Sequence, residues 1–339
     1  MKKLKRTYTR CALTASLVLL VLLVAGSIWD LPISKFLYPG HESSLGQFFA
    51  AFGELPAFSL LAGCGVLLIV HRAKFRPELN VILLAFGVCL TLASMFLAVH
   101  EATDNVSALP MAVALLVTVF IDALTAFALL FLTRECQTKT ILRFVCTVIV
   151  VCVGIMLLIN IIKVPWGRAR MRLIYATGND TYFSNWWQAG TALKKKLVAD
   201  GVASDEFRSF PSGHTACAAC SMLLILLPTL YRRLHNKEKL FMAIGGVWTL
   251  AVAVSRLRMG MHFLSDVSVS SLLTIALGAV AVWLFYFNKP FFNKIWAFVS
   301  GEAKPEKKLK KPEEPYRRPS KQTQFVGAGR CSARQKMVF

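Results

Sequence analysis

Charged side chains are scarce in this chain. Asp, Glu, Lys and Arg make up 17% of the 339 residues and apolar types make up 56%, whereas a soluble domain averages roughly 25% charged and 45–50% apolar residues. A soluble globular protein is therefore disfavoured, and the density of Leu, Val, Ile and Phe excludes disorder over most of the length. The composition predicts an integral membrane protein.

Several common functional signatures are also missing. The sequence contains no internal repeat, no phosphate-binding P-loop and no G-x-G-x-x-G dinucleotide signature. Cys217 and Cys220 have the C-x-x-C spacing of a zinc or thiol-redox site, but they lie in an apolar segment without a second ligand pair. We predict that they are buried small hydrophobic residues.

Long apolar runs, in contrast, are abundant. We find eight, each near the roughly 20 helical residues needed to cross a ~30 Å hydrocarbon core. They cover residues 11–29, 47–70, 79–99, 109–132, 141–162, 213–231, 240–254 and 267–287. We therefore predict an all-α, polytopic membrane helix bundle with about eight transmembrane helices.

Lys and Arg collect on one side of this predicted bundle, as they do in cytoplasmic loops. The basic segments are 2–10, 72–76, 134–139 and 232–239. We predict a plasma (inner) membrane protein with a basic N-terminus at 1–10, both termini cytoplasmic, and residues 30–46, 163–212 and 255–266 extracytoplasmic. Segment 163–212 is nevertheless rich in cations, which indicates either an anionic ligand or a loop long enough to be translocated regardless of charge.

The C-terminal region, 288–339, has a different composition. Lys, Arg, Glu and Pro interleave over 304–318, and few apolar residues follow. We predict a basic, disordered cytoplasmic tail. Basic residues beside a membrane also attract anionic lipid, at about 1 kcal/mol for each Lys or Arg near the surface. We predict no nucleic-acid partner, because no aromatic-bearing nucleic-acid fold accompanies the run.

The tetrapeptide Pro211-Ser212-Gly213-His214 lies where the long outer segment enters the sixth span. Ser212 is a typical N-cap, and Gly213 lets a backbone N–H approach a ligand closely. Unpaired N–H groups at a helix start attract anions. The motif therefore predicts a phosphate cradle with a histidine beside it, although a simple capped helix start explains the same residues.

A second polar group precedes the last span. His262 and Asp266 are four residues apart, so on a helix they share a face, and the carboxylate can hold one ring nitrogen while the other reacts. Ser255-Arg256 on the same side supplies a guanidinium fork that matches a phosphate. A structural hydrogen bond is the alternative interpretation of the histidine–carboxylate pair.

A third group follows the fifth span and consists of Lys163, Arg168, Arg170 and Arg172. By themselves these residues would be interpreted as cations that anchor a helix end at the interface. All three groups, however, fall on the same predicted face at membrane-surface depth. Their convergence favours a site for a phosphorylated membrane lipid.

In order and spacing, the three groups resemble the three-part signature of the type 2 phosphatidic acid phosphatase superfamily, with Lys163-x6-Arg170, Pro211-Ser212-Gly213-His214 and Ser255-Arg256-x5-His262-x3-Asp266. That superfamily includes lipid phosphate phosphatases, bacterial undecaprenyl diphosphate phosphatases and vanadium haloperoxidases. The resemblance covers roughly 160–287. It implies a six-helix lipid phosphatase-like core with a catalytic region at 133–287, and two of the four N-terminal transmembrane helices at 11–132 as additions to that core.

One position departs from the family pattern. A proline usually follows the arginine of the first motif, and Met171 stands there in this chain. Arg168 and Arg172 are therefore candidates to share or take over the role of Arg170.

The resemblance also implies roles for the site residues. His262 would attack phosphorus and form a phosphohistidine, Asp266 would hold the tautomer of His262, and His214 would serve as general acid and then general base. The phosphoryl oxygens would be bound by Lys163, Arg170, Ser212, the Gly213 backbone N–H and Arg256. Neither a metal nor another cofactor is expected, because these cations take the place of a metal ion.

The implied activity is hydrolysis of a lipid phosphate or diphosphate, with phosphatidate, phosphatidylglycerol phosphate and undecaprenyl diphosphate all compatible. Two alternatives remain: transfer of the phosphoryl group to an alcohol, and a phospholipid transporter that uses Glu54 and Asp122, two acids within apolar spans. Aromatic residues of the outer segment suit either an interfacial belt or a lid over the site, and they are Tyr182, Phe183, Trp186 and Trp187.

Overall fold

The structure is a computed structural model that describes residues 2–41 and 43–301. These residues belong to one compact unit, Met1–Glu302. The part of the predicted tail at 302–339 lies outside the described residues. Within the described ranges every regular element is a helix, which confirms the all-α prediction.

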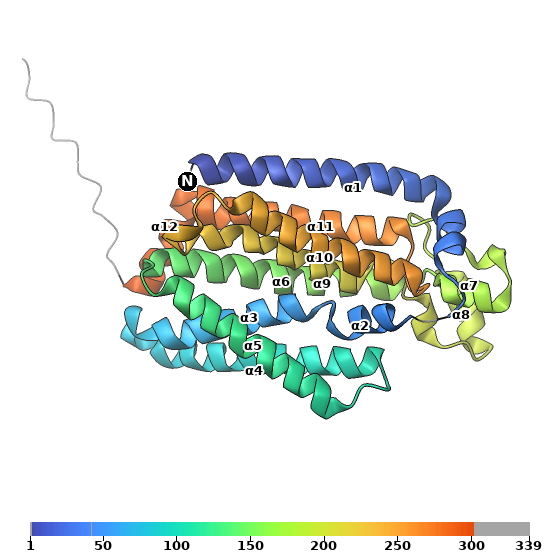
Figure 1. Cartoon of the computed structure of the whole chain (residues 1–339), viewed down its shortest axis with the longest axis horizontal. Helices are drawn as coiled ribbons and strands as arrows, with labels where there is room; N and C mark the ends of the chain where they lie inside the picture. Colours follow the sequence, from blue (N-terminus) through green and yellow to red (C-terminus); the bar gives the residue numbers. More distant parts are fainter. Residues whose placement is uncertain (1, 42, 302–339) are drawn as a thin grey trace, which may run out of the picture. The chain divides into compact units, whose positions relative to one another are not determined.

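Long helices form the bundle, and several shorter ones close its ends (Figure 1). The long helices are α1 (Lys2–Leu37), α3 (Leu55–His71), α4 (Asn80–Asn105), α5 (Met111–Thr133), α6 (Thr138–Trp166), α10 (Glu238–Arg258) and α11 (Leu264–Val282). The shorter α-helices are α2 (Ser44–Phe52), α7 (Met171–Thr177), α8 (Thr191–Ala199), α9 (Gly213–Ala219) and α12 (Lys289–Ser300).

Single turns and tighter or wider helical segments connect these elements. The 3₁₀ segments are η1 (Arg72–Lys74), η2 (Pro77–Leu79), η3 (Asp180–Tyr182), η4 (Ser204–Phe207), η5 (Cys220–Thr229) and η6 (Arg232–Leu234). A π-helical turn, η7 (Trp283–Phe287), continues α11.

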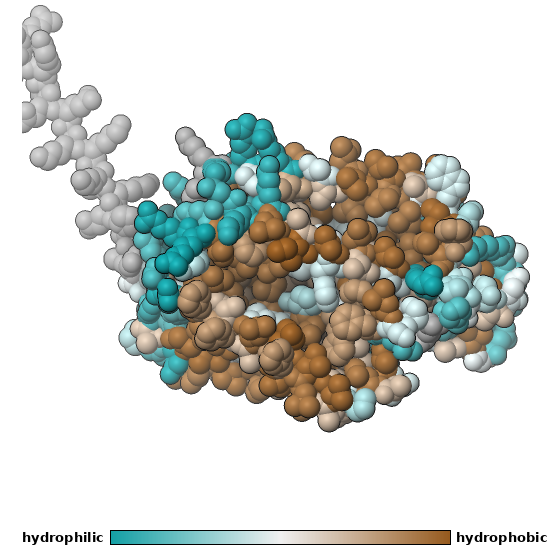
Figure 2. Space-filling view, viewed as in Figure 1, coloured by the Kyte–Doolittle hydropathy of each residue, from teal (hydrophilic) through white to brown (hydrophobic). Residues whose placement is uncertain are grey.

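The helices are long and apolar enough to cross a membrane. Seven candidate spans occur in the described ranges, and α9 with η5 forms an eighth, shorter apolar helix at Gly213–Thr229. Large apolar side chains such as Leu17, Phe120 and Val247 are exposed on the outside of the bundle. Figure 2 shows apolar residues across the middle of the visible face and hydrophilic residues toward its two ends. This arrangement confirms the polytopic prediction, because lipid solvates such a surface.

The interior is built around α6. Phe144, Val148, Val151 and Ile155 recur at helical spacing along it and are fully buried. Helix α1 runs along one side of the bundle next to α11, while α3 and α4 pack together on the other side (Figure 1). The core therefore joins the N-terminal helices to the region that carries the three sequence motifs.

Two parts of the structure differ from the sequence-based expectation. Residues 289–300 were assigned to a disordered tail, but they form α12, whose Phe292 is buried in the main core because α12 presents an apolar face. The connection 167–212 is a folded cap rather than an open loop. Its own small core contains Ala169, Leu173, Leu197 and Phe207.

Candidate active site

One cavity of about 300 Å³ brings the three motifs together at the end of the bundle that the cap covers. Each motif contributes to its wall, with Lys163 and Arg170, Gly213 and His214, and Arg256 and His262. These residues come from α6, α9, α10 and the adjoining segments, up to 99 positions apart from Lys163 to His262. The convergence that the sequence predicted is thus present in the fold.

His262 lies between α10 and α11, and its surroundings define its chemical state. Its Nδ1 lies 2.5 Å from the carbonyl oxygen of Ser209. A carbonyl only accepts, so Nδ1 carries the proton and Nε2 carries the lone pair. Burial, together with the positive charges of Lys163 and Arg170, lowers the pKa of His262 well below its ordinary value. The ring is therefore a neutral imidazole, the form that can act as a nucleophile.

Asp266 supports His262 from the first turn of α11. Its Oδ2 lies 3.9 Å from His262 Nδ1, and the same oxygen accepts hydrogen bonds from Ser209 Oγ at 2.6 Å and Phe263 N at 2.8 Å. The carboxylate therefore fixes Ser209, whose carbonyl in turn binds the histidine. The predicted shared helical face is not the reason for this proximity, because His262 precedes the first residue of α11.

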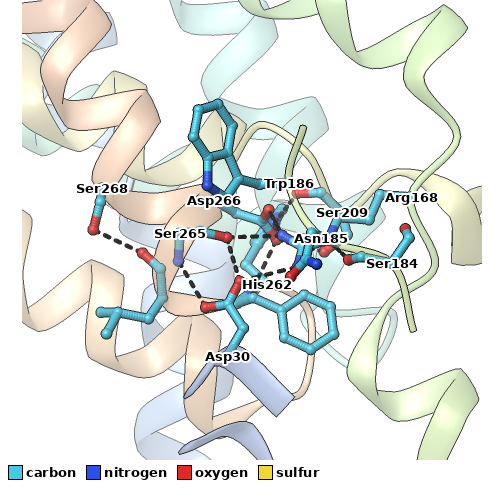
Figure 3. A network of polar contacts seen from close by, with 12 residues as sticks. Asp30, Arg168, Ser184, Asn185, Trp186, Ser209, His262, Ser265, Asp266 and Ser268 are labelled. Carbon is cyan, nitrogen blue, oxygen red and sulfur yellow. Dashed lines mark hydrogen bonds and ion pairs between the residues drawn. The ribbon is translucent and has the colours of Figure 1, made fainter. Parts of the chain in front are cut away.

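A buried ion-pair network holds Asp266 in place (Figure 3). Arg168 is 0% exposed and is paired with both Asp266 and Asp30, the latter at 2.9 Å. Its Nε donates to the Ser184 carbonyl at 2.8 Å, and its NH1 donates to Ser265 Oγ at 2.9 Å. Asp30 also accepts from Ser265 N at 3.0 Å. Helix α1 is thereby connected to the start of α11.

The contacts of this network show which arginines near the first motif are free to line the cavity. Arg168 does not line the cavity and is committed to the two carboxylates. Arg170 and Arg172 do line it. The Nε of Arg170 is buried without a hydrogen-bond partner among the described residues, a donor that a phosphoryl oxygen would satisfy. Met171, at the position of the usual proline, is buried against Ile174 and Phe263.

The cations of the cavity are held from several directions. Lys163 belongs to the last turn of α6, and Gly167, with φ +71°, ends that helix and turns the chain toward Arg170. Arg170 is paired with Asp205 of the cap. Arg256 is 1% exposed, and its NH2 donates to the Gly46 carbonyl of α2 at 3.0 Å.

The start of α9 presents a short backbone turn to the cavity. Ser212 is the N-cap, and its Oγ accepts from Thr215 N at 3.4 Å. Ser212 itself is fully buried and does not line the cavity. Gly213 does, and a Cβ added there would lie 3.5 Å from Lys163 Nζ. The absence of a side chain at 213 thus leaves the backbone open toward the cation.

His214 contacts the backbone of α2 and Glu54, an acid to which sequence reasoning gave a role only in the transporter alternative. Its Nδ1 lies 3.1 Å from Glu54 Oε1, and its Nε2 lies 3.0 Å from the Ala50 carbonyl. Sequence reasoning named Glu54 as a candidate functional acid, but it missed Asp30. Asp30 and Glu54 share one sequence signal, a carboxylate at the end of or within an apolar run. This signal identified Glu54 and Asp122, but it was not applied to Asp30, which directly follows the run at 11–29.

The aromatic residues of the cap do not form a lid. Tyr182, Phe183, Trp186 and Trp187 are absent from the cavity wall. Phe183 packs edge-on against Phe263 with ring centroids 5.3 Å apart, and Trp186 Nε1 donates to Ser27 Oγ at 2.9 Å. Phe183 thus packs against the network behind His262, and Trp186 attaches the cap to α1.

A metal-binding cluster is not found among residues 2–41 and 43–301, where no three histidine, cysteine or acidic side chains are arranged to hold an ion. Cys217 and Cys220 are both buried, as predicted. The cavity wall carries both signs of charge: the cations are Lys163, Arg170, Arg172, Arg208 and Arg256, and the acids are Glu54, Glu101, Asp104 and Asp205.

The fold and cavity define an all-α polytopic membrane protein with a cation-lined cavity at one end, and comparison with known proteins shows what the region that carries the three motifs resembles. Residues 144–290, called the family region below, match the family model of the PAP2 superfamily. All eight residues of the predicted site lie within it.

Curated relatives agree with this assignment. Phosphatidylglycerophosphatase B of Escherichia coli K12 is 45% identical over 106 residues, which cover 29% of this chain and 40% of the relative. Phosphatidylglycerophosphatase B of Haemophilus influenzae is 35% identical over 85 residues, covering 25% of this chain and 35% of the relative. The chain thus aligns with well under half of the length of these relatives. Asp30 and Glu54 lie outside the family region.

Proposed function

We propose that this protein is a phosphatase that hydrolyses the phosphate ester of a membrane lipid. One observation carries the proposal: a neutral, carbonyl-bound His262 and the acid–base candidate His214 line one cavity with Lys163, Arg170 and Arg256. An anion-binding protein needs the cations, but it has no need of a neutral imidazole held in a single tautomer. A reaction at phosphorus needs both.

The proposed reaction has two steps. In the first, the Nε2 lone pair of His262 forms a bond to phosphorus, the P–O bond to the lipid breaks, and His214 gives a proton to the departing oxygen. In the second, His214 accepts a proton from water, whose oxygen bonds to phosphorus as the P–N bond breaks. The cations stabilise the charge on the phosphoryl oxygens in both transition states, which is the task a metal ion performs in other phosphatases.

The substrate we propose to test first is phosphatidylglycerol phosphate, because the curated relatives are named for that activity. Phosphatidate and undecaprenyl diphosphate present the same phosphoryl group to the same cavity. The position of the cavity at one end of an apolar bundle suits a substrate whose phosphate lies in the headgroup layer while its chains stay in the hydrocarbon core.

We also propose that the cavity faces the extracytoplasmic side and that both termini are cytoplasmic. The basic connections meet at the end of the bundle opposite the cap, where Lys139 Nζ donates to Asn293 at 2.9 Å and Lys3 contacts Asn236. Under the positive-inside rule this end is cytoplasmic. A cysteine introduced at exposed Asp180 of the cap should react with a membrane-impermeant maleimide in intact cells, and one introduced at exposed Asn236 should react only after lysis.

Phosphate release by the purified protein in detergent and EDTA tests the activity. We expect release from at least one of the three lipids, insensitive to EDTA and abolished in His262→Ala. A folded protein that releases no phosphate but flips a labelled lipid in vesicles would be a transporter. Asp122, which the transporter alternative requires, contacts Ser59 at 2.6 Å and does not line the cavity.

Water and an alcohol acceptor use the same residues, so the assay includes glycerol as a competing acceptor. Inorganic phosphate as the main product supports hydrolysis. Phosphoglycerol as the main product would identify the protein as a phosphotransferase.

A further inference from the structure

The second transmembrane run is broken beside the cavity, and the break delivers a carboxylate to His214. Helix α2 ends at Phe52, and α3 begins at Leu55 with Pro56 in its first turn (Figure 1). Trp248 of α10 fixes the break by donating from Nε1 to the Gly53 carbonyl at 3.0 Å. Glu54 stands at the N-cap position of α3, but its side chain makes no capping hydrogen bond. The carboxylate is therefore available to the cavity.

The contact between Glu54 and His214 is close and largely shielded from solvent. Glu54 Oε1 lies 3.1 Å from His214 Nδ1, and the two side chains are 10% and 11% exposed. The other ring nitrogen, Nε2, lies 3.0 Å from the Ala50 carbonyl, one helical turn before Glu54. Helix α2 and the break after it thus contact both nitrogens of this histidine from outside the family region.

Charged groups on four other elements face this pair. Lys163 on α6, Arg170 after α6 and Arg256 on α10 are positive, whereas Glu101 on α4 is negative. Cys217 on α9 forms a hydrogen bond with Glu54. The positive charges of Lys163, Arg170 and Arg256 disfavour an imidazolium at His214, so a general acid at this position requires an anion close to the ring.

We propose that Glu54 is a positioning residue for His214 and forms a second carboxylate–histidine pair in the site. Glu54 holds Nδ1, which fixes the orientation of the ring and favours its protonated form. The proton at Nε2, which meets the Ala50 carbonyl in this structure, is the one transferred to the departing lipid oxygen as the P–O bond breaks. This inference rests on the proposed phosphatase function.

The nature of the leaving group provides the test. Help from a general acid matters most for a poor leaving group, such as the alkoxide of a lipid, and least for p-nitrophenolate. The value of kcat/KM reports the step in which the leaving group departs. We compare Glu54→Gln with wild type on dihexanoyl phosphatidate and on p-nitrophenyl phosphate. Asp122→Asn is the matched control, an acid of an apolar span that contacts Ser59 rather than a cavity residue.

We expect Glu54→Gln to lower kcat/KM about 10- to 100-fold on dihexanoyl phosphatidate and less than about threefold on p-nitrophenyl phosphate. KM should not rise, because Glu54 is not one of the cations proposed to bind the phosphoryl oxygens. Asp122→Asn should match wild type on both substrates. Melting curves of the three proteins show whether each is folded.

Two results would overturn this inference alone. Equal losses of kcat/KM on both substrates would assign Glu54 a general structural role, and an unchanged value on phosphatidate would assign it none. A wild-type protein that is folded yet cleaves neither substrate would instead overturn the proposed function, and the positioning role with it.

Discussion

Asp30 provides the strongest test of how the site is held together. It lies on α1, 114 residues before the family region begins, and is 2% exposed. Its carboxylate is paired with Arg168 at 2.9 Å and accepts from both the backbone N and the Oγ of Ser265. The substitution Asp30→Asn keeps the shape of the side chain but removes its charge. It also places an NH2 group, which donates hydrogen bonds, opposite at least one of the groups that now donate to the carboxylate.

The expected loss of stability follows from burial. Removing one partner of a buried ion pair costs about 3–5 kcal/mol. Arg168 retains Asp266 as a partner, so we expect the lower end of that range, about 3 kcal/mol. With an unfolding entropy of about 2.1 cal/mol/K per residue, each kcal/mol shifts the melting temperature of the unit Met1–Glu302 by about 1.6 °C. Asp30→Asn should therefore melt about 5 °C below wild type.

A fluorescence-monitored melt in detergent measures this shift, and Asp180→Asn serves as the control. Asp180 forms an ion pair with Lys35, also on α1, at 2.5 Å, but the two side chains are 55% and 48% exposed. Exposed pairs contribute about 0–1 kcal/mol, so the control should stay within about 2 °C of wild type. If Asp30→Asn melts no lower than Asp180→Asn, the network does not support the site as argued.

Three further predictions concern the cavity. Gly213→Ala should keep the melting temperature of the wild type, because the added methyl group meets only Lys163 Nζ, at 3.5 Å, and two atoms at 4.0 Å. The methyl group should nevertheless crowd the phosphoryl oxygens and raise KM about tenfold, a change of about 1.4 kcal/mol. An unchanged KM in steady-state kinetics would argue against the placement of the phosphoryl group at Gly213. Asp205→Asn removes the carboxylate paired with Arg170 and so frees the positive charge of Arg170 for an anion. The phosphate analogue vanadate should therefore inhibit this variant about three- to tenfold more tightly than wild type. Weaker inhibition would contradict the role of Arg170 in binding the phosphoryl oxygens. Burial and the positive charges of Lys163 and Arg170 lower the pKa of His262, so the nucleophile stays unprotonated at more acidic pH than a free imidazole. After correction for the ionisation of the substrate phosphate near pH 6, kcat/KM should therefore fall on the acid side with a midpoint below about pH 6.5. A midpoint at or above pH 6.5 would show that His262 is an ordinary imidazole.

Much of the fold followed from the lengths of the apolar runs. Runs of about 20 residues predicted the spans because lipid requires continuous helices. The break at Gly53–Glu54 has a local sequence signal, a glycine followed by Pro56. The length of the apolar run, however, predicted one continuous span over 47–70 and did not indicate the break. The order of α12 could not be predicted, because its stability comes from burial of Phe292 in a core assembled by other helices.

The site was predictable where residue types and spacing carry the chemistry. The six cavity-lining residues of the three motifs were named correctly as neighbours. The direct partner of His262 was not, because a backbone carbonyl such as that of Ser209 has no sequence signature. Asp30 and Glu54 act on residues 138 and 160 positions away, Arg168 and His214, and tertiary packing alone creates those pairs.

The central claim, attack by His262 on phosphorus, is tested most directly by trapping the phosphoenzyme. The purified protein is mixed with phosphatidate labelled with ³²P in its phosphate, quenched within milliseconds in denaturant, and digested. The account predicts a label on the peptide that contains His262, stable to base and labile to acid as a phosphohistidine is, and absent from His262→Ala. A label that persists in His262→Ala, or that resides on another residue, would contradict the account.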